Sequence, residues 1–303
     1  MGRVRRGRRI GAPAPLDSAL LLDKPSGITS ARAVSRVKRL LPRKTKIGHT
    51  GTLDPLASGL LVLLIGRATR LSRYITGLDK SYTATARLGA VSDTLDADGN
   101  VTPLPDSPLP DEPALRAATR RFTGELLQTP PMASAVKVGG ERLYKLHRRG
   151  EEIERQSRPV TVHSFDLLSL DSETATFTIS CGSGTYVRTL VADLAESLHT
   201  GAYLTTLRRT RVGHLAIENA IEPNDLSSET LHSRIIQTRD VVSFLPVVEV
   251  SEGERFGVCN GRKLGEFGLP GSYRVEAGGE LLAVYRDGEG EARAEVVLCA
   301  GVS

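Results

Sequence analysis

One aspartate in the sequence has the surroundings of a chemically active carboxylate. Asp54 lies in GHTGTLDPLASGLL, residues 48–61, among small and polar residues and directly before an apolar run. The Asp-Pro step predicts that Asp54 caps a helix beginning at Pro55, because the proline ring fixes φ at a helical value. The free N–H groups of such a helix start would keep the carboxylate ionised at neutral pH. Asp54 is therefore a candidate nucleophile or base, and a cap can also be a catalyst.

Three side chains elsewhere in the chain are candidate companions of this carboxylate. Tyr82 lies in KSYTATARL, where strict alternation predicts a half-buried strand with the tyrosine on its inward face. Tyr186 and Arg188 lie in CGSGTYVRT, which leads from a predicted strand into a predicted helix. A paired arginine would orient the Asp54 carboxylate and lower its pKa further. The glycines of this turn fit a phosphate site and a plain strand-to-helix turn equally well.

The motifs of metal and cofactor sites are absent from the sequence. The six histidines show no zinc-binding spacing, and the Walker A, G-x-G-x-x-G and G-x-S-x-G patterns do not occur. DTLDADGN, residues 93–100, resembles part of a calcium loop, but the alignment puts Pro105 where the loop needs a glutamate. Cys181, Cys259 and Cys299 form no C-x-x-C pair, so we expect neither a disulfide nor a zinc site. The sequence predicts no metal and no cofactor.

Positive charge is clustered along the chain. The net charge is only +5, with an isoelectric point near 9.2. Lysines and arginines nevertheless gather in four segments, residues 3–9, 32–46, 137–149 and 208–211. Each cluster alone could be a solvated face or a disordered arm. Together they predict a positive track for a polyphosphate partner such as RNA, on whose flipped bases the tyrosines could stack.

The order of predicted elements indicates an α+β protein with two domains and a basic arm. Residues 1–15 are predicted to be disordered, and residues 125–155 look like an arm inserted into the larger domain, 16–244. Short strand-like runs separated by glycine-rich turns predict a small β-rich domain over 245–303. No apolar run reaches the roughly 18 residues that a membrane helix needs, and no signal peptide is recognised, so we expect a cytoplasmic protein. Further expected elements are a strand over 19–22, a helix starting at Thr29 or Ser30, a helix over 114–122, a strand over 175–179 and a helix over 187–198.

The segment around Asp54 resembles the catalytic motif of the TruB family of tRNA pseudouridine synthases. The resemblance extends, in the family's order, to LLLDKPSGITS, DKSYTATARLG with SDTLDADG, GSGTYVRTLVADL and LRRTRVG, over residues 20 to about 213. It implies a mixed, mainly antiparallel sheet with flanking helices and a PUA-like C-terminal domain. It also implies that the protein isomerises uridine 55 in the T-loop of tRNA to pseudouridine on a flipped-out nucleotide, without a cofactor.

The resemblance assigns roles to individual residues. It makes Asp54 the catalytic aspartate, which attacks C1′ or removes a proton from C2′ and must be ionised for either. Tyr82 would stack on the base and is a candidate for the final proton removal from C5, and Arg188 would pair with the aspartate. The remaining matches are expected in substrate binding: Tyr186 and Leu207 in the uracil pocket, His49 in the T-loop, and Lys24 near the Asp23 turn. His49, Leu207 and Lys24 could instead serve only a loop hydrogen bond, the core and the Asp23 turn.

The inserted arm departs from the family pattern at one position. In QTPPMASAVK the family usually has an aromatic residue where this chain has Ala133. We expect the arm to bind RNA through Lys137, Arg142 and Lys145, but less tightly than in relatives that carry the aromatic ring. Substituting Ala133 by tyrosine should then strengthen tRNA binding.

Three rival functions fit parts of the sequence. A guide-RNA-dependent branch of the same family works in a multi-protein particle and carries a fuller PUA domain, whereas the short C-terminal domain favours a stand-alone monomer without an obligatory protein partner. A second rival is a protein that binds or folds RNA on the same scaffold without chemistry. A third is an aspartate-dependent base-excision enzyme, which would share the first bond cleavage and release free uracil.

Overall fold

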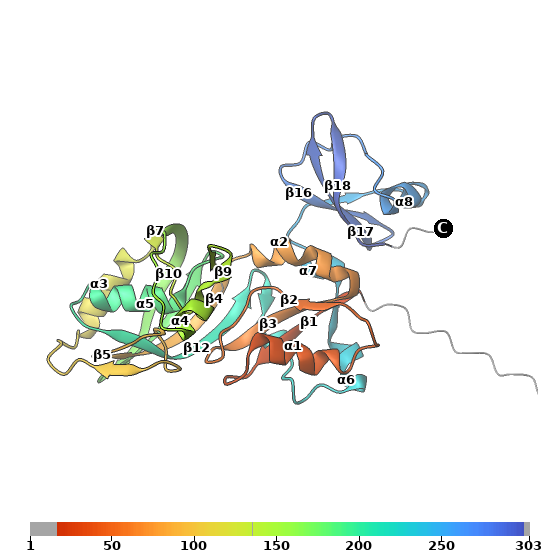
Figure 1. Ribbon diagram of the computed structural model, residues 1–303. Coiled ribbons are helices and arrows are strands. Elements are labelled where there is room, and N and C mark those ends of the chain that lie inside the picture. Colours follow the sequence, from red (N-terminus) through yellow and green to blue (C-terminus); the bar gives the residue numbers. More distant parts are fainter. Residues whose placement is uncertain (1–16, 135, 300–303) are drawn as a thin grey trace, which may run out of the picture.

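The structure is a computed structural model that describes residues 17–134 and 136–299 (Figure 1). The predicted basic arm, residues 1–15, lies outside this range. One sheet of ten strands forms the body, in the spatial order β14-β1-β3-β12-β4-β11-β10-β7, with β2 added to β3 and β13 to β12. Its strands are β1 (Ser18–Lys24), β2 (Ile47–His49), β3 (Ser58–Ile65), β4 (Lys80–Leu88), β7 (Gly124–Gln128), β10 (Arg158–Asp171), β11 (Thr174–Cys181), β12 (Ala202–Val212), β13 (Leu215–Ala216) and β14 (Ile235–Gln237).

Helices cover both faces of this sheet and separate two cores. Residues of β1 alternate between them, because Leu20 and Leu22 face one core while Ala19 and Leu21 face the other. The first core is closed by α1 (Ser30–Lys38), α3 (Glu112–Arg121) and α5 (Val187–Glu196), and the second by η1 (Gly66–Leu71), α2 (Ser72–Thr76) and α7 (Thr238–Val241). The other elements of the body are β5 (Ala90–Ser92), β6 (Val101–Pro103), β8 (Lys137–Val138), β9 (Glu141–Arg142), α4 (Leu143–Arg148), η2 (Ile217–Asn219) and α6 (Ser228–Arg234).

Most of the expected elements of the body are confirmed. Thr29 caps α1, its side chain accepting a hydrogen bond from the Arg32 N–H, and Tyr82 lies in β4 as the alternation predicted. The mixed, mainly antiparallel sheet with flanking helices is confirmed as well. Residues 125–128 of the predicted arm lie in β7, which pairs with β10. No helix in the described part of the chain is long and apolar enough to cross a membrane.

The prediction of a helix beginning at Pro55 is wrong. Residues 50–57 form an irregular loop, here called the catalytic-motif loop, and the apolar run that follows it is the strand β3. Every residue of β3 after Ser58 is buried, because each face of the strand contacts one of the two cores. A strand buried on both faces carries a continuous apolar run without alternation, which a short buried helix segment resembles. Asp54 is therefore a loop residue and not a helix cap.

The sheet is nearly divided where β3 meets β12. These strands are parallel and pair only through Arg208 with Ser58 and Arg209 with Gly59. A Cβ atom at Gly59, whose φ is +100°, would lie 2.2 Å from the Arg209 carbonyl oxygen, so only glycine fits there. The catalytic-motif loop leads directly into this contact and is thereby held at the centre of the sheet.

The C-terminal module has a sheet of four strands and one helix. Its elements are β15 (Val247–Glu249), β16 (Ser272–Ala277), β17 (Glu280–Gly288), β18 (Glu291–Val297) and α8 (Glu252–Cys259). Leu281, Val284 and Val296 extend the second core of the body, and Figure 1 shows the module beside α2 and α7. The carboxylate of Glu295 accepts a hydrogen bond from the Tyr74 hydroxyl of α2 at 2.7 Å. The module is therefore attached to the helices of one sheet face.

A disulfide joins Cys259 in α8 to Cys299, which corrects the expectation that the cysteines form none. Their sequence spacing gave no signal, because the two residues meet only when the module folds. Closing this loop of 40 residues restricts the unfolded chain and should stabilise the module by about 4 kcal/mol. We expect urea unfolding of the oxidised protein to shift to lower urea concentration on reduction, and the Cys299→Ser protein to be insensitive to reductant. Equal midpoints with and without reductant would contradict this prediction.

Candidate active site

Asp54 and Arg188 form an ion pair at the start of α5. The Arg188 Nη2 lies 2.9 Å from the Asp54 Oδ2, and the Nη1 lies 3.2 Å from the Oδ2 of Asp96. The guanidinium also donates to the carbonyl oxygens of Thr94, at 2.6 Å, and of Ala133, at 2.8 Å. The Arg188 side chain is only 4% exposed, whereas the Asp54 side chain is 40% exposed. One buried cation thus fixes an accessible carboxylate and ties it to the loops on either side.

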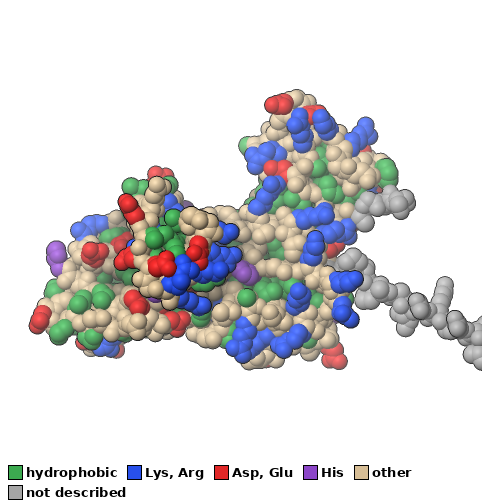
Figure 2. Space-filling model, viewed as in Figure 1, with side chains coloured by type: hydrophobic (Ala, Val, Ile, Leu, Met, Phe, Trp, Pro, Cys, Tyr) green, Lys and Arg blue, Asp and Glu red, His purple; other side chains and the backbone are tan. Residues whose placement is uncertain are grey.

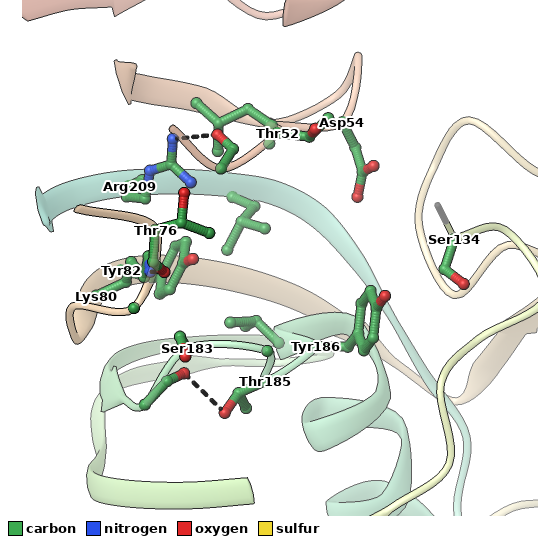
Figure 3. Close-up of a pocket in the computed structure, with 18 of the residues that line it drawn as sticks. Thr52, Asp54, Thr76, Lys80, Tyr82, Ser134, Ser183, Thr185, Tyr186 and Arg209 are labelled. Atoms are coloured by element: carbon green, nitrogen blue, oxygen red, sulfur yellow. Dashed lines mark hydrogen bonds between the residues drawn. The ribbon is translucent and has the colours of Figure 1, made fainter. Parts of the chain in front are cut away.

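Asp54 reaches into a cavity of about 920 Å³ between the catalytic-motif loop, α2, β4, β12 and the start of α5. Tyr82, Tyr186, Leu207 and Arg188 share this cavity with Asp54. In Figure 3 the Asp54 side chain points from its loop toward the Tyr186 ring, with Tyr82 further along the same wall. Two aromatic rings and an aliphatic side chain around one carboxylate suit a flat, partly apolar group such as a nucleobase.

A second compartment of about 620 Å³ lies on the other side of the ion pair. Asp54 and Arg188 line it together with His49, Arg142 and Ala133. The other two arm residues expected to bind RNA, Lys137 and Lys145, are exposed on the arm but do not line either compartment. The structure therefore brings Asp54 and six of the other nine predicted site residues to these two compartments: Tyr82, Arg188, His49, Tyr186, Leu207 and Arg142.

The pKa of Asp54 is raised from its ordinary value, mainly because burial disfavours the charged carboxylate. The positive charge of Arg188 opposes this shift and Asp96 reinforces it. The lowered pKa expected from the sequence is therefore wrong, because no helix N-terminus stands behind the carboxylate. Burial also raises the pKa of Tyr82, so its phenol is neutral at neutral pH. A neutral phenol is a weak base, which favours stacking over proton removal for this residue.

Comparison with known proteins identifies the family. Residues 38–187 match the model of the TruB family pseudouridylate synthase N-terminal domain, and residues 188–242 match that of the tRNA pseudouridylate synthase B C-terminal domain. The chain is 43% identical to tRNA pseudouridine synthase B of Burkholderia mallei over 298 residues, which cover 94% of this chain and 98% of that protein. It belongs to the TruB family of tRNA pseudouridine synthases. The enzyme of Azoarcus sp. with the same name is 42% identical over 274 residues, 89% of this chain and 90% of its own.

Solved structures of low sequence identity share the fold of this TruB family member. One is an H/ACA RNP bound to a substrate RNA containing 2′-deoxyuridine, with a TM-score of 0.72 and 22% identity, covering 94% of this chain and 86% of that chain. Another is a Cbf5-Nop10-Gar1 complex, with a TM-score of 0.72 and 23% identity, covering 94% and 85%. The pseudouridine synthase fold predicted from the sequence is therefore confirmed, and the chain is an isomerase by family.

Lys24, which was predicted to bind substrate, does not line either compartment of this TruB protein. Its side chain is fully buried at the end of β1. The ammonium donates to the carbonyl oxygens of Pro25 at 2.9 Å, Ile28 at 2.8 Å and Pro55 at 3.4 Å. Burial lowers the pKa of Lys24 to about 8. We interpret Lys24 as a positioning residue, since Pro55 directly follows Asp54.

Replacing Lys24 by methionine should therefore impair turnover more than RNA binding. The substitution leaves buried carbonyl oxygens without a donor, which costs about 1–3 kcal/mol for each group left unpaired. We expect a 10- to 100-fold lower single-turnover rate, an RNA dissociation constant within about threefold of wild type, and reduced thermal stability. A normal rate in a destabilised protein would show that Lys24 serves the fold alone.

Arg209 is a site residue that the sequence did not single out. It was counted in the basic cluster 208–211, but its side chain is 1% exposed, and Arg208 is paired with Asp23. Arg209 Nε donates to the Leu60 carbonyl oxygen at 2.8 Å and Nη2 to that of Gly51 at 3.1 Å. Figure 3 shows this guanidinium between the catalytic-motif loop and Tyr82. Arg209 is therefore not part of a basic surface, and it supports the loop that carries Asp54.

Gln128 and Arg158 hold Tyr186 from the opposite side. The two residues pair across β7 and β10. The Gln128 amide accepts from the Tyr186 N–H at 2.7 Å and donates to its carbonyl oxygen at 3.1 Å. Arg158 donates to the Gly184 carbonyl oxygen at 2.8 Å, and its guanidinium lies 5.1 Å from the centre of the Tyr186 ring. The turn before α5 is thereby fixed, and its glycines serve a strand-to-helix turn.

Proposed function

We propose that the chain isomerises uridine 55 in the T-loop of tRNA to pseudouridine, with Asp54 as the catalytic carboxylate. The main support is the 2.9 Å ion pair between Asp54 and Arg188 at the wall of a cavity. Tyr82, Tyr186 and Leu207 line the same cavity. The 43% identity to tRNA pseudouridine synthase B of Burkholderia mallei supports tRNA as the substrate. An accessible, partly buried carboxylate beside aromatic walls suits chemistry on a base that has left its helix.

The proposed reaction rearranges bonds within one nucleotide. The ionised Asp54 attacks C1′ or removes the C2′ proton, and the bond between C1′ and N1 breaks with its electron pair going to the uracil. The uracil rotates and C5 bonds to C1′, while the Asp54 carboxylate leaves C1′ in the first case or the proton returns to C2′ in the second. The proton on C5 is then lost, and N1 gains a proton. No oxidant, reductant or co-reactant is consumed, so the residues of the cavity suffice. Arg188 orients the carboxylate, and Tyr82 and Tyr186 hold the uracil plane.

The surrounding surface supports recognition of RNA by a single chain. Arg142, Lys137 and Lys145 of the arm flank the second compartment or lie near it and are proposed to bind phosphates. The C-terminal PUA-like module is proposed to add RNA contacts. We propose a cytoplasmic monomer without an obligatory protein partner, in keeping with the small C-terminal module of four strands and one helix.

The test uses purified protein and an unmodified tRNA transcript, with no guide RNA and no other protein. Pseudouridine is mapped by chemical modification and primer extension, and free uracil is measured in the same reactions. We expect pseudouridine at position 55 alone. Release of free uracil would favour base excision, a requirement for added RNA or protein would favour the guide-dependent branch, and binding without modification would favour an RNA-folding role.

A further inference from the structure

The outer face of α1 carries three arginines in a row. Arg32 and Arg36 in α1 and Arg39, the C-cap residue of the helix, follow one another at helical spacing. With Ser35 they line a shallow surface pocket of about 410 Å³. The opposite face of the helix is buried through Ala33 and Val37. The arginines therefore cannot turn toward the core, and we call them the α1 arginine face.

This face lacks carboxylate partners, which about half of the other exposed or half-buried arginines in the described part of the chain have. Among the described residues, no Asp or Glu oxygen lies within 4.0 Å of a guanidinium nitrogen of Arg32, Arg36 or Arg39. Arg36 Nη1 donates only to the Asn224 Oδ1, at 3.2 Å. Glu222 and Asp225 flank that asparagine in the sequence without reaching the arginines. The loop after α1 adds three exposed cations: Arg43, Lys44 and Lys46.

The face is continuous with the catalytic cleft. Thr29, Ser30 and Ala31, the residues directly before Arg32, line the second compartment together with Asp54. With a rise of 1.5 Å per residue, Arg39 lies about 10 Å further along the helix than Arg32. Figure 2 shows Lys and Arg side chains gathered over α1 on the lower right of the body. An RNA strand that leaves this compartment along α1 would meet Arg32 first and Arg39 about two helical turns further on.

The cleft also extends toward the C-terminal module. The first compartment is lined by Arg70 and Arg73, and these side chains contact Val297 and Glu295 of the module. The stem of a hairpin whose loop fills the cleft can leave on one side only. We place the stem beside the module, where Arg70 and Arg73 line the first compartment, and this leaves the side of α1 for RNA from another part of a folded tRNA.

We propose that the α1 arginine face binds the phosphodiester backbone of tRNA outside the T-arm stem-loop. The inference rests on the proposed function, because it requires the T-loop to occupy the cleft. Arginine guanidinium groups without carboxylate partners are suited to phosphate oxygens, and each such contact releases counterions from the RNA. The face would make a full-length tRNA a better ligand than its isolated T-arm.

The experiment compares Arg32→Gln/Arg39→Gln with a matched control, Arg120→Gln/Arg121→Gln, which removes two exposed charges from α3. Arg36 is kept so that its bond to Asn224 survives. Dissociation constants are measured for three RNAs over a series of salt concentrations: full-length tRNA, a minihelix of acceptor stem and T-arm, and the isolated T-arm stem-loop. For full-length tRNA we expect about 10-fold weaker binding by the α1 variant, and a slope of log affinity against log salt that is shallower by about 2. Binding of the isolated T-arm stem-loop should change less than twofold, and the control should resemble wild type. A weakening shared by the minihelix would place the contact on the acceptor stem, and one confined to full-length tRNA would place it elsewhere outside the T-arm; both support the proposal.

Two results would overturn the proposal. Equal weakening for all three RNAs would place the face in the T-arm site, and unchanged binding of full-length tRNA would show a merely solvated face. Pseudouridine formation by the wild type is recorded separately with each RNA. If the wild type modifies none of them, the proposed function fails, while the binding comparison still decides whether the face contacts RNA outside the T-arm.

Discussion

Asp54→Asn should abolish pseudouridine formation and leave tRNA binding intact. Asparagine keeps the size of the side chain and an oxygen that can accept from Arg188, but it can neither attack C1′ nor take a proton. We expect the single-turnover rate to fall at least about 1,000-fold. The fold should survive, because Arg188 still pairs with Asp96 and donates to two carbonyl oxygens. The tRNA dissociation constant should stay within about threefold of wild type or decrease, since one negative charge is removed near the RNA phosphates.

A matched control separates this effect from the change in charge. Asp98 also lines the second compartment and is exposed, so Asp98→Asn removes the same charge from the same cleft. We expect that variant to retain its rate within about fivefold. An Asp54→Asn protein that still forms pseudouridine at a comparable rate would exclude Asp54 as the catalytic group, whatever its ion pair suggests.

The dependence of the single-turnover rate on pH tests the role of the Asp54 carboxylate independently. The reaction needs Asp54 ionised, and burial raises its pKa. Activity should therefore be lost on acidification at a higher pH than the ordinary aspartate value of about 3.9 would give. The measurement is the single-turnover rate against pH on the low side of neutrality, with binding saturated at every pH.

The elements predicted correctly from the sequence are those that bury only one face, because their apolar residues recur with a regular period. In β4 the alternation from Tyr82 to Leu88 matches a strand with a single buried side, and the apolar spacing of α1 and α5 matches helices that cover one core. The apolar run after Asp54, which forms β3, has no such period. Because β3 is buried on both faces, it shows no period, and the Asp-Pro step then favoured a helix that does not exist.

The site could be predicted only in part, because its partners come from distant segments. Tyr82 and Arg188 were found by alternation, by the turn before α5 and by resemblance to the family. Asp96 was dismissed with the rejected calcium loop, yet it accepts the second contact of Arg188. Arg209 was counted as surface charge, and nothing in its local sequence indicates that β12 passes under the catalytic-motif loop. Tertiary packing decides such contacts, so pattern and spacing could not supply them.

Variants of Arg188 should separate its effect on the reaction, through Asp54, from its effect on stability, through Asp96. In Arg188→Met the carboxylate of Asp96, whose residue is 3% exposed, loses its cation, and breaking a buried pair in this way costs about 3–5 kcal/mol. Asp54 loses its orienting partner as well, and its pKa rises further because the opposing charge is gone. We expect a rate at least 100-fold lower, with any residual activity lost on acidification at a higher pH than in wild type. Unfolding in urea and single-turnover rates against pH measure the two effects.

The double variant Arg188→Met/Asp96→Asn is the decisive comparison. Asparagine at position 96 can still accept from the Thr94 hydroxyl and the Asp98 N–H, which lie 2.6 and 3.1 Å from the present carboxylate, so no charge is left buried. Most of the lost stability should therefore return. The rate should not return, because nothing holds the Asp54 carboxylate over the cavity. Recovery of both would show that Arg188 acts on catalysis only through the fold, whereas recovery of stability alone identifies its contact with Asp54 as the catalytic one.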